Sequence, residues 1–206
     1  MPQAYVATCL LAAGLLLVLA RRDGRSWSDL GLGGRHARTG LRWGAVLAGA
    51  VLLLDVVAAQ LPLTREAFAD TRATALSGAA VLWHVLIRIP LGTALLEEVA
   101  FRGVLYAMLA RRSGVPAAIA GSSLLFGLWH VLPSIGLREA NAAVGDLVGA
   151  GPAGTVVTVI GAVLGAAIAG VVLCELRRRS GSLLAPFVLH WSLNGSGLVL
   201  AWAALS

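Results

Sequence analysis

Six long apolar stretches, with the charged residues gathered between them, constrain this chain more than any other feature. Five have about the length that an α-helix needs to cross a bilayer core, roughly 20 residues. They cover residues 4–20, 43–61, 117–131, 155–174 and 183–203. The sixth, 78–110, would extend about 50 Å as a straight helix, which is too long for one span. Pro90 lies inside it, and proline removes a backbone donor. We predict an all-α polytopic transmembrane bundle of about six spans, one of them broken near Pro90.

The composition supports lipid as the solvent of this chain. Hydrophobic residues make up 58% of it and charged residues 13%, against about 45–50% and 25% in soluble domains. So few charges cannot cover the wetted surface of a soluble domain of 206 residues. The net charge of +6 sits in short runs between apolar stretches, which argues against a nucleic-acid-binding protein. We expect a single membrane-embedded domain over residues 1–206, with the lipid bilayer as a partner and no nucleic acid.

The placement of arginine predicts the orientation in the membrane. Three connections are rich in arginine, at 21–42, 111–112 and 177–179, whereas 62–77 and 132–154 carry no net positive charge. Cytoplasmic loops of membrane proteins carry an excess of basic residues. Six spans with both termini outside would place every arginine-rich connection in the cytoplasm. The first stretch is interpreted as a retained span, because its arginines follow the apolar run. We predict a multi-pass protein of the cell membrane.

Several ionisable residues lie inside the apolar stretches, where they are costly and usually face the protein interior. Asp55 stands alone in its stretch, and we expect it to make an interhelical hydrogen bond. His84 and Arg88 lie one helical turn apart before Pro90. We expect both near the outer interface, where arginine can extend toward water; contact with a substrate is the less favoured alternative. The path of residues 78–96 stays open.

Three short motifs on successive stretches combine the remaining polar residues. They are Glu97-Glu98-x-x-x-Arg102, Phe126-x-x-x-His130 and His190-x-x-x-Asn194. Residues four apart share a helix face, so Glu98 can pair with Arg102, and His190 can point to the same spot as Asn194. Counted inward from the cytoplasmic ends at about 1.5 Å per residue, the motifs reach one pocket in the middle to cytoplasmic half of the bilayer.

This combination of groups suits hydrolysis. A carboxylate beside two imidazoles and an amide can activate water and stabilise an oxyanion. We favour Glu97 over Glu98 as the general base. An ion pair with Arg102 would fix the orientation of Glu98 and leave Glu97 on a different face.

The motifs, in this order on successive hydrophobic segments, resemble the CPBP family, the membrane-embedded CAAX-processing and bacteriocin-processing proteases also called the ABI family. The resemblance covers about residues 92–198 and includes Phe101-Arg102-Gly103 and Ser182-Leu-Leu-Ala-Pro186. Residues 1–91, which hold the amino-terminal spans and the arginine-rich loop, match only through Asp29-Leu-Gly-Leu. The resemblance implies an intramembrane endopeptidase acting on a membrane-associated peptide or protein.

The resemblance also implies roles for the motif residues. Glu97 and His130 would activate the water. His190 and Asn194 would stabilise the oxyanion, and Glu98 with Arg102 would support these groups. The family includes proteins described as metalloproteases and others that depend on glutamate without a metal, so a divalent cofactor such as zinc stays open. Glu97, His130 and His190 would offer three ligands and leave a position for water, although the chain has no His-Glu-x-x-His helix.

Two other classes of function remain as alternatives. The first is a bacteriocin self-immunity or scaffold protein without proteolysis. The second is a proton-coupled transporter, because glutamate, arginine and histidine in a bundle also describe a proton relay. Away from the motifs, we expect a close-packing face formed by Gly161-x-x-x-Gly165 together with Ala166, Ala167, Ala169 and Gly170. We expect Trp129, like the other tryptophans of the spans, to be a core or interfacial anchor. Prenylation of the substrate and the oligomeric state stay open.

Overall fold

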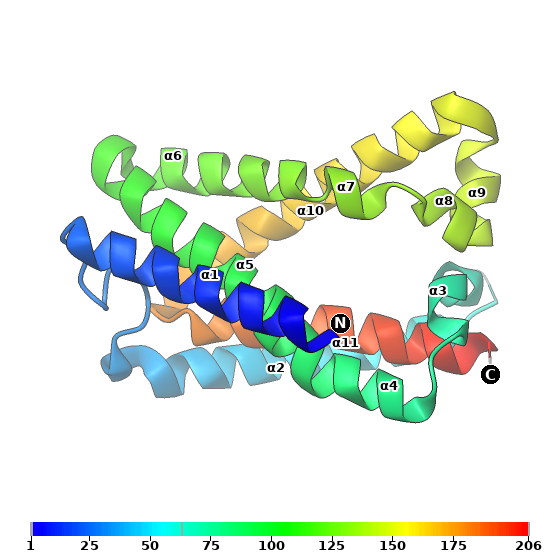
Figure 1. Cartoon of the computed structure of the whole chain (residues 1–206), viewed down its shortest axis with the longest axis horizontal. Coiled ribbons are helices and arrows are strands. Elements are labelled where there is room, and N and C mark those ends of the chain that lie inside the picture. Colours follow the sequence, from blue (N-terminus) through cyan, green and yellow to red (C-terminus); the bar gives the residue numbers. More distant parts are fainter. Residues whose placement is uncertain (1, 63, 206) are drawn as a thin grey trace.

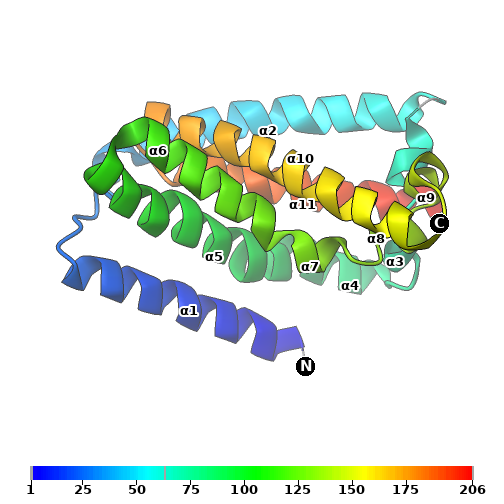
Figure 2. The same ribbon diagram turned by 90° about the horizontal axis from the view of Figure 1, so that it is seen from above.

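The computed structural model describes residues 2–62 and 64–205, and these form a bundle of long helices without a strand (Figure 1). The predicted all-α class is confirmed. Four long helices are α1 (Pro2–Arg22), α2 (Ala37–Gln60), α10 (Gly151–Ser180) and α11 (Leu184–Leu205). A further continuous run consists of α4 (Gly78–Trp83), η3 (His84–Ala94), α5 (Leu95–Glu97), η4 (Glu98–Leu105) and α6 (Tyr106–Trp129). Figure 2 shows α1 and α2 at opposite edges of the bundle, with the other long helices between them.

Five helical runs are long and apolar enough to cross a membrane, and one of them contains a sharp turn. They are Ala4–Arg22, Gly34–Gln60, Gly78–Trp129, Gly151–Ser180 and Leu184–Ala204. The third run covers 52 residues and reverses direction at Gly114, where φ is 82° and ψ is 171° (Figure 1). Glycine adopts this positive φ without a steric penalty. Counting the two legs of this run separately gives the six spans that the sequence predicts.

The helix is not broken at Pro90. Residues 84–94 wind as a π-helix, and the backbone N–H of Leu95 donates to the carbonyl of Pro90. In an α-helix the proline ring would clash with the carbonyl of the preceding turn, and the wider π-helical winding accommodates a residue without a donor. The break that we expected near Pro90 is therefore replaced by a local change of helix type, and residues 78–96 follow one continuous helix.

Short helices close one end of the bundle. They are η2 (Arg65–Phe68), α3 (Thr71–Thr74), α8 (Leu137–Ala140) and α9 (Ala142–Val148). A further short helix, α7 (Val131–Ser134), follows α6 part-way along the bundle (Figure 1). The side-chain amide of Asn141 donates to the carbonyl of Ala67 at 2.8 Å, and its oxygen accepts from Val144 N–H at the start of α9. One side chain thus joins two connections that lie far apart in the sequence.

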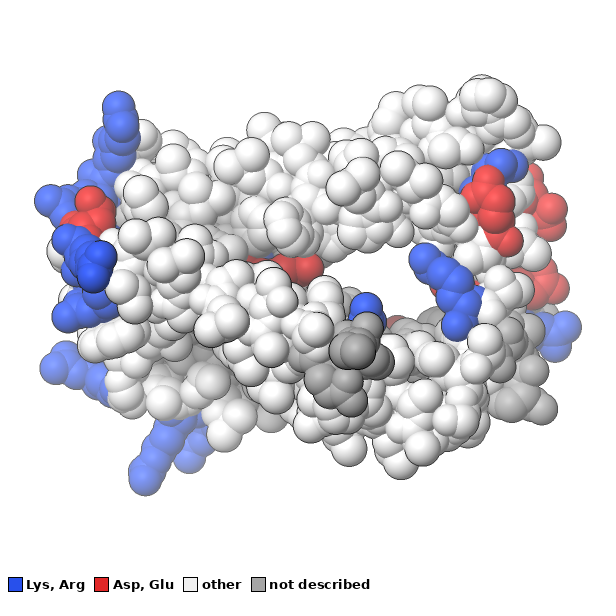
Figure 3. Space-filling view, viewed as in Figure 1, with Lys and Arg blue, Asp and Glu red and all other residues white. Residues whose placement is uncertain are grey.

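The opposite end of the bundle carries the arginine-rich connections (Figure 3). There α1 ends, α6 turns, α10 ends, and the short helix η1 (Gly34–His36) precedes α2. The connection after α1 lies against the bundle, because Leu30 is fully buried and the N–H of Leu183 donates to the carbonyl of Gly31 at 2.8 Å. Arg177 on α10 donates to the carbonyl of Asp29, also at 2.8 Å. The structure thus separates an end rich in arginine from an end with charges of both signs.

The close-packing face on α10 agrees only in part with the one that we expected. A Cβ atom at Gly161 or Gly165 would meet nothing within 4 Å. At Gly127 on α6, by contrast, it would lie 2.6 Å from the carbonyl oxygen of Val163 and 2.9 Å from Cβ of Ala167. A Cβ at Gly170 would likewise lie 3.0 Å from Cα of Ser123 on α6. The prediction is therefore confirmed for Ala167 and Gly170, and it was wrong for Gly161 and Gly165, which the rotation of α10 turns away from α6.

Candidate active site

A fully buried ion pair lies in the middle of the bundle. The side chains of Glu98 and Arg102 are 0% exposed, and Nη1 of Arg102 donates to Oε1 of Glu98 at 3.0 Å. The same carboxylate oxygen lies 2.7 Å from Nδ1 of His190 on α11. Both glutamate and arginine belong to the π-helical segment η4. The predicted pairing of Glu98 with Arg102 is confirmed, and it extends to a histidine from another helix.

The ring of Phe126 contacts three charged or titratable groups. The guanidinium of Arg102 lies 3.9 Å from its centroid. The rings of His130 and His190 lie 4.7 and 5.9 Å from it, both in edge-to-face geometry. Such contacts of a cation with an aromatic face are favourable when the cation is desolvated. Phe126 thereby fixes the spacing between residues of all three motifs.

Glu97 occupies a different environment from its neighbour Glu98. Its Oε1 accepts a hydrogen bond from the indole N–H of Trp129 at 3.1 Å. Its Oε2 is buried without a hydrogen-bond partner among the described residues and lies 3.7 Å from Nε2 of His190. We predicted Trp129 only as an anchor, and its contact with Glu97 was missed. Its position directly before His130 in the sequence is the one signal that could have found it.

His130 lies at the carboxyl end of α6, where the chain turns into α7. Its Nδ1 is 2.8 Å from the carbonyl oxygen of Phe126. A carbonyl can only accept, so Nδ1 carries the proton of this hydrogen bond. In the neutral ring, Nε2 is then the nitrogen with the free electron pair.

A cavity of about 570 Å³ brings these groups to one place. The site residues that line it are Glu97, Trp129, His130 and Asn194, and Tyr5 and Arg88 line it as well. Figure 3 shows a hollow on this face of the molecule, with acidic and basic atoms at its walls. His190 is 5% exposed and is not part of the cavity wall, but lies against Glu97. Of the four residues assigned to chemistry from the sequence, three share the cavity and His190 contacts one of them.

The three possible metal ligands are not arranged as a ligand set. Within residues 2–62 and 64–205, no group of three His, Cys, Asp or Glu side chains could hold a metal ion. Nδ1 of His190 faces Glu98 and Nδ1 of His130 faces its own helix, so only the Nε2 atoms of the two rings are free to bind a metal ion. Glu97, His130 and His190 are nevertheless not gathered closely enough among the described residues to form such a ligand set.

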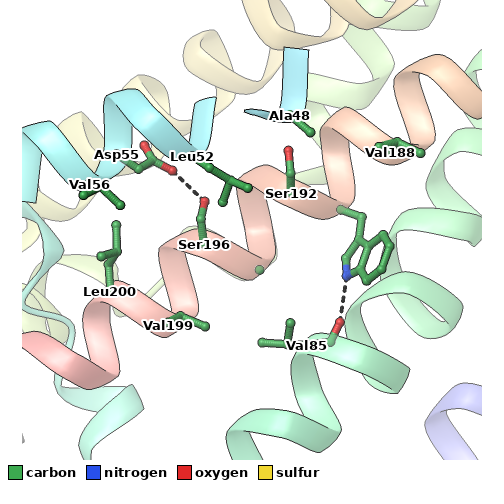
Figure 4. Close-up of a pocket in the computed structure, with 12 residues that line it drawn as sticks. Ala48, Leu52, Asp55, Val56, Val85, Val188, Ser192, Ser196, Val199 and Leu200 are labelled. Carbon is green, nitrogen blue, oxygen red and sulfur yellow. Dashed lines mark hydrogen bonds between the residues drawn. The ribbon is translucent and has the colours of Figure 1, made fainter. Parts of the chain in front are cut away.

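The polar residues outside the motifs lie in two other pockets. Oγ of Ser196 donates to Asp55 at 2.6 Å, which confirms the predicted interhelical hydrogen bond (Figure 4). The pocket beside it has a volume of about 390 Å³ and is mostly apolar. His84 and Arg88 line a second pocket, near the end of the bundle closed by the short helices. Arg88 also lines the cavity of the candidate active site.

Comparison with known proteins identified one family. Residues 79–196 match the family described as Rce1-like, type II CAAX prenyl endopeptidase Rce1-like. This segment begins in α4 and ends in α11, so it contains all three motifs. No curated protein and no solved structure matches the chain.

Proposed function

Because the chain belongs to the Rce1-like family of type II CAAX prenyl endopeptidases, we propose that it hydrolyses a peptide bond of a membrane-associated substrate by means of Glu97, His130 and Asn194. The observation that carries this proposal is the shared cavity, which brings a carboxylate, an imidazole and a carboxamide from three helices to one wall. The free oxygen of Glu97 supports it further. A buried acceptor without a partner is where a water molecule can bind.

The proposed reaction begins with this water. Oε2 of Glu97 accepts a proton from the water while the water oxygen attacks the carbonyl carbon of the scissile peptide bond. A C–O bond forms, and the carbonyl electron pair moves onto oxygen. The side-chain N–H of Asn194 donates to this oxyanion. When the C–N bond breaks, the proton passes from Glu97 to the leaving amine. The role of His130 comes earlier: its Nε2 orients the attacking water by accepting a hydrogen bond from the second O–H of that water.

The buried groups behind the cavity act as positioning residues in this proposal. Glu98 holds Nδ1 of His190, and Nε2 of His190 then faces Oε2 of Glu97. The ring of His190, held by Glu98, packs against the carboxylate of Glu97 and limits by its bulk the orientations that this carboxylate can take. We assign His190 to this role rather than to the oxyanion, because it lies against Glu97 outside the cavity wall.

The orientation follows from the charges. We propose that the arginine-rich end faces the cytoplasm, with both termini directed to the other side, in line with the positive-inside rule. The substrate would enter through the hollow seen in Figure 3, between α1 and η3 on one side and α6 and α7 on the other.

The test is cleavage of a farnesylated peptide ending in Cys-aliphatic-aliphatic-X by the purified protein in liposomes. Glu97→Gln and His130→Ala should each lower turnover by about 10²-fold or more while thermal unfolding stays unchanged. Glu175→Gln serves as the control, since Glu175 pairs only with Arg178 and Arg179 at the end of α10. Full turnover by Glu97→Gln would refute the proposal.

Two further measurements separate the alternative functions. Protection against a bacteriocin that both variants retain would favour the immunity function, and a proton flux that both variants lose would favour transport.

A further inference from the structure

Arg88 differs from the other arginines around the cavity and its neighbouring pocket. It lies within a predicted span, in η3, and its guanidinium stacks on the ring of Tyr5 at 4.7 Å. No Asp or Glu of the described segments lies within ion-pairing distance of it. Arg72 and Arg138 pair with acidic neighbours. Arg88 is partly exposed and lines two hollows, so its unpaired guanidinium is available to an anionic ligand.

The position of Arg88 connects two hollows. Its side chain lines the cavity that contains Glu97 and also the pocket lined by His84 and Arg72. A ligand bound at Arg88 can therefore extend along the same cavity as far as Glu97.

The separation of Arg88 from Glu97 determines how long the part of the ligand between them must be. Arg88 lies nine residues before Glu97 on the same helical run. Nine residues of α-helix would rise about 13 Å, and the wider π-helical winding of residues 84–94 makes the rise shorter than this. An extended peptide covers roughly 3.3–3.6 Å per residue. Three or four residues of an extended peptide therefore bridge the two side chains.

We infer that Arg88 binds the terminal carboxylate of the peptide substrate, and this inference rests on the proposed function. A guanidinium binds a carboxylate through two parallel hydrogen bonds. With the carboxylate held at Arg88, the peptide bond three or four residues before the end of the substrate lies at Glu97. Arg88 thereby determines both that the enzyme acts on a free carboxyl end and which bond it cleaves.

Binding tests this assignment without requiring turnover. The Glu97→Gln protein in liposomes of zwitterionic lipid is titrated with a farnesylated peptide as the free acid and as the carboxamide, with tryptophan fluorescence as the readout. The acid should bind about tenfold more tightly or better, as expected for a charge-assisted pair. The additional substitution Arg88→Gln should abolish this difference. Arg72→Gln, which removes an arginine already paired with Asp70, should leave it intact.

Three outcomes would overturn the inference. Equal affinity for acid and amide would show that the carboxylate is not recognised. Equal weakening of both peptides by Arg88→Gln would indicate a structural role. If the variant instead alters only the response to added phosphatidylglycerol, the anion at Arg88 is a lipid phosphate.

Kinetics on the otherwise unchanged protein test the positioning of the scissile bond. Arg88→Gln should raise KM for the acid about tenfold and change KM for the amide little. Peptides with three or four residues after the cleaved bond should react faster than those with one or six, and this preference should weaken in the variant. A protein that binds acid over amide through Arg88 but cleaves neither would refute the proposed function while leaving the binding assignment in place.

Discussion

The two halves of the bundle differ in whether their charged groups are buried or line a cavity. In the half built around η4, Glu98 and Arg102 are enclosed on all sides, and the nearby connection is fixed by Leu30 and by Arg177. In the half built around η3 and α7, the helices leave a cavity and a second pocket, where Arg88 is without an ionic partner among the described residues. Charges that hold the fold are enclosed away from any cavity, whereas the groups proposed for chemistry line one.

The boundary between the two halves falls between two consecutive residues. Glu98 is enclosed with Arg102 and His190, whereas Glu97 lines the cavity. Adjacent positions on a helix point in different directions. Two neighbouring carboxylates can therefore serve a structural role and a reactive role without interfering.

Removing the enclosed charge should have the largest effect. Glu98→Gln leaves Arg102 buried without its counter-charge, which should cost about 3–5 kcal/mol in the free energy of unfolding. Chemical unfolding in detergent micelles measures this loss. Glu175→Gln, which breaks pairs with partly exposed Arg178 and Arg179, should cost much less, because solvent screens exposed ion pairs. Similar losses in the two variants would show that burial does not distinguish the two sites.

In the open half, a substitution should affect rate and not stability. Asn194→Ala removes the proposed oxyanion donor and should lower kcat about 10²–10³-fold, with KM and thermal unfolding little changed. Ser192→Ala on the same helix is the control, because its hydroxyl donates to the carbonyl of Leu189. A parallel loss of stability in Asn194→Ala would contradict the separation of roles.

The contact between α6 and α10 tests how tightly the helices pack beside the site. Gly127→Ala should destabilise the protein by about 1–3 kcal/mol, because the added methyl group meets the carbonyl of Val163. Gly161→Ala on α10 has open space and should be neutral or stabilising by up to about 1 kcal/mol. Equal unfolding free energies of the two variants would contradict the observed rotation of α10.

We expect the smallest effect from lowering the pH, which acts through Asp29 in the connection after α1. The backbone N–H of Ser26 donates to Oδ2 of Asp29 at 2.8 Å. This bond, together with the side chain of Ser26, holds the pKa of Asp29 below its ordinary value of 3.8. A lowered pKa in the folded state contributes stability at higher pH, and this contribution is lost as the pH falls through the folded value. Unfolding of Asp29→Asn should therefore depend slightly less on pH than that of the unchanged protein below about pH 4. A steeper acid dependence in the variant would reverse the expected sign.

The sequence predicted the features that depend on length and on local spacing. The spans followed from apolar length, the connection between the two legs of 78–129 followed from the separation of the stretches 78–110 and 117–131, and the pair of Glu98 with Arg102 followed from a spacing of four. The match to the protease family agrees with the resemblance based on the three motifs. The spans, the connection between the two legs and the ion pair depend only on residues that are close together in the sequence.

What the sequence could not predict depends on how helices rotate against each other. Pro90 shows that a backbone donor is missing but not which winding replaces it. A Gly-x-x-x-Gly pattern does not specify which face of α10 meets α6, and the contact of Trp129 with Glu97 requires that same rotation. The position of His190 against Glu97, and not in the cavity wall, is likewise a property of the packed bundle.

The phenyl ring of Phe126 has a mechanical consequence. Because Arg102, His130 and His190 all rest on it, the ring acts as a common spacer for three groups from three helices. A smaller side chain would let all three shift together. The size of this one hydrocarbon ring therefore determines how precisely the guanidinium and the two imidazoles are placed relative to one another.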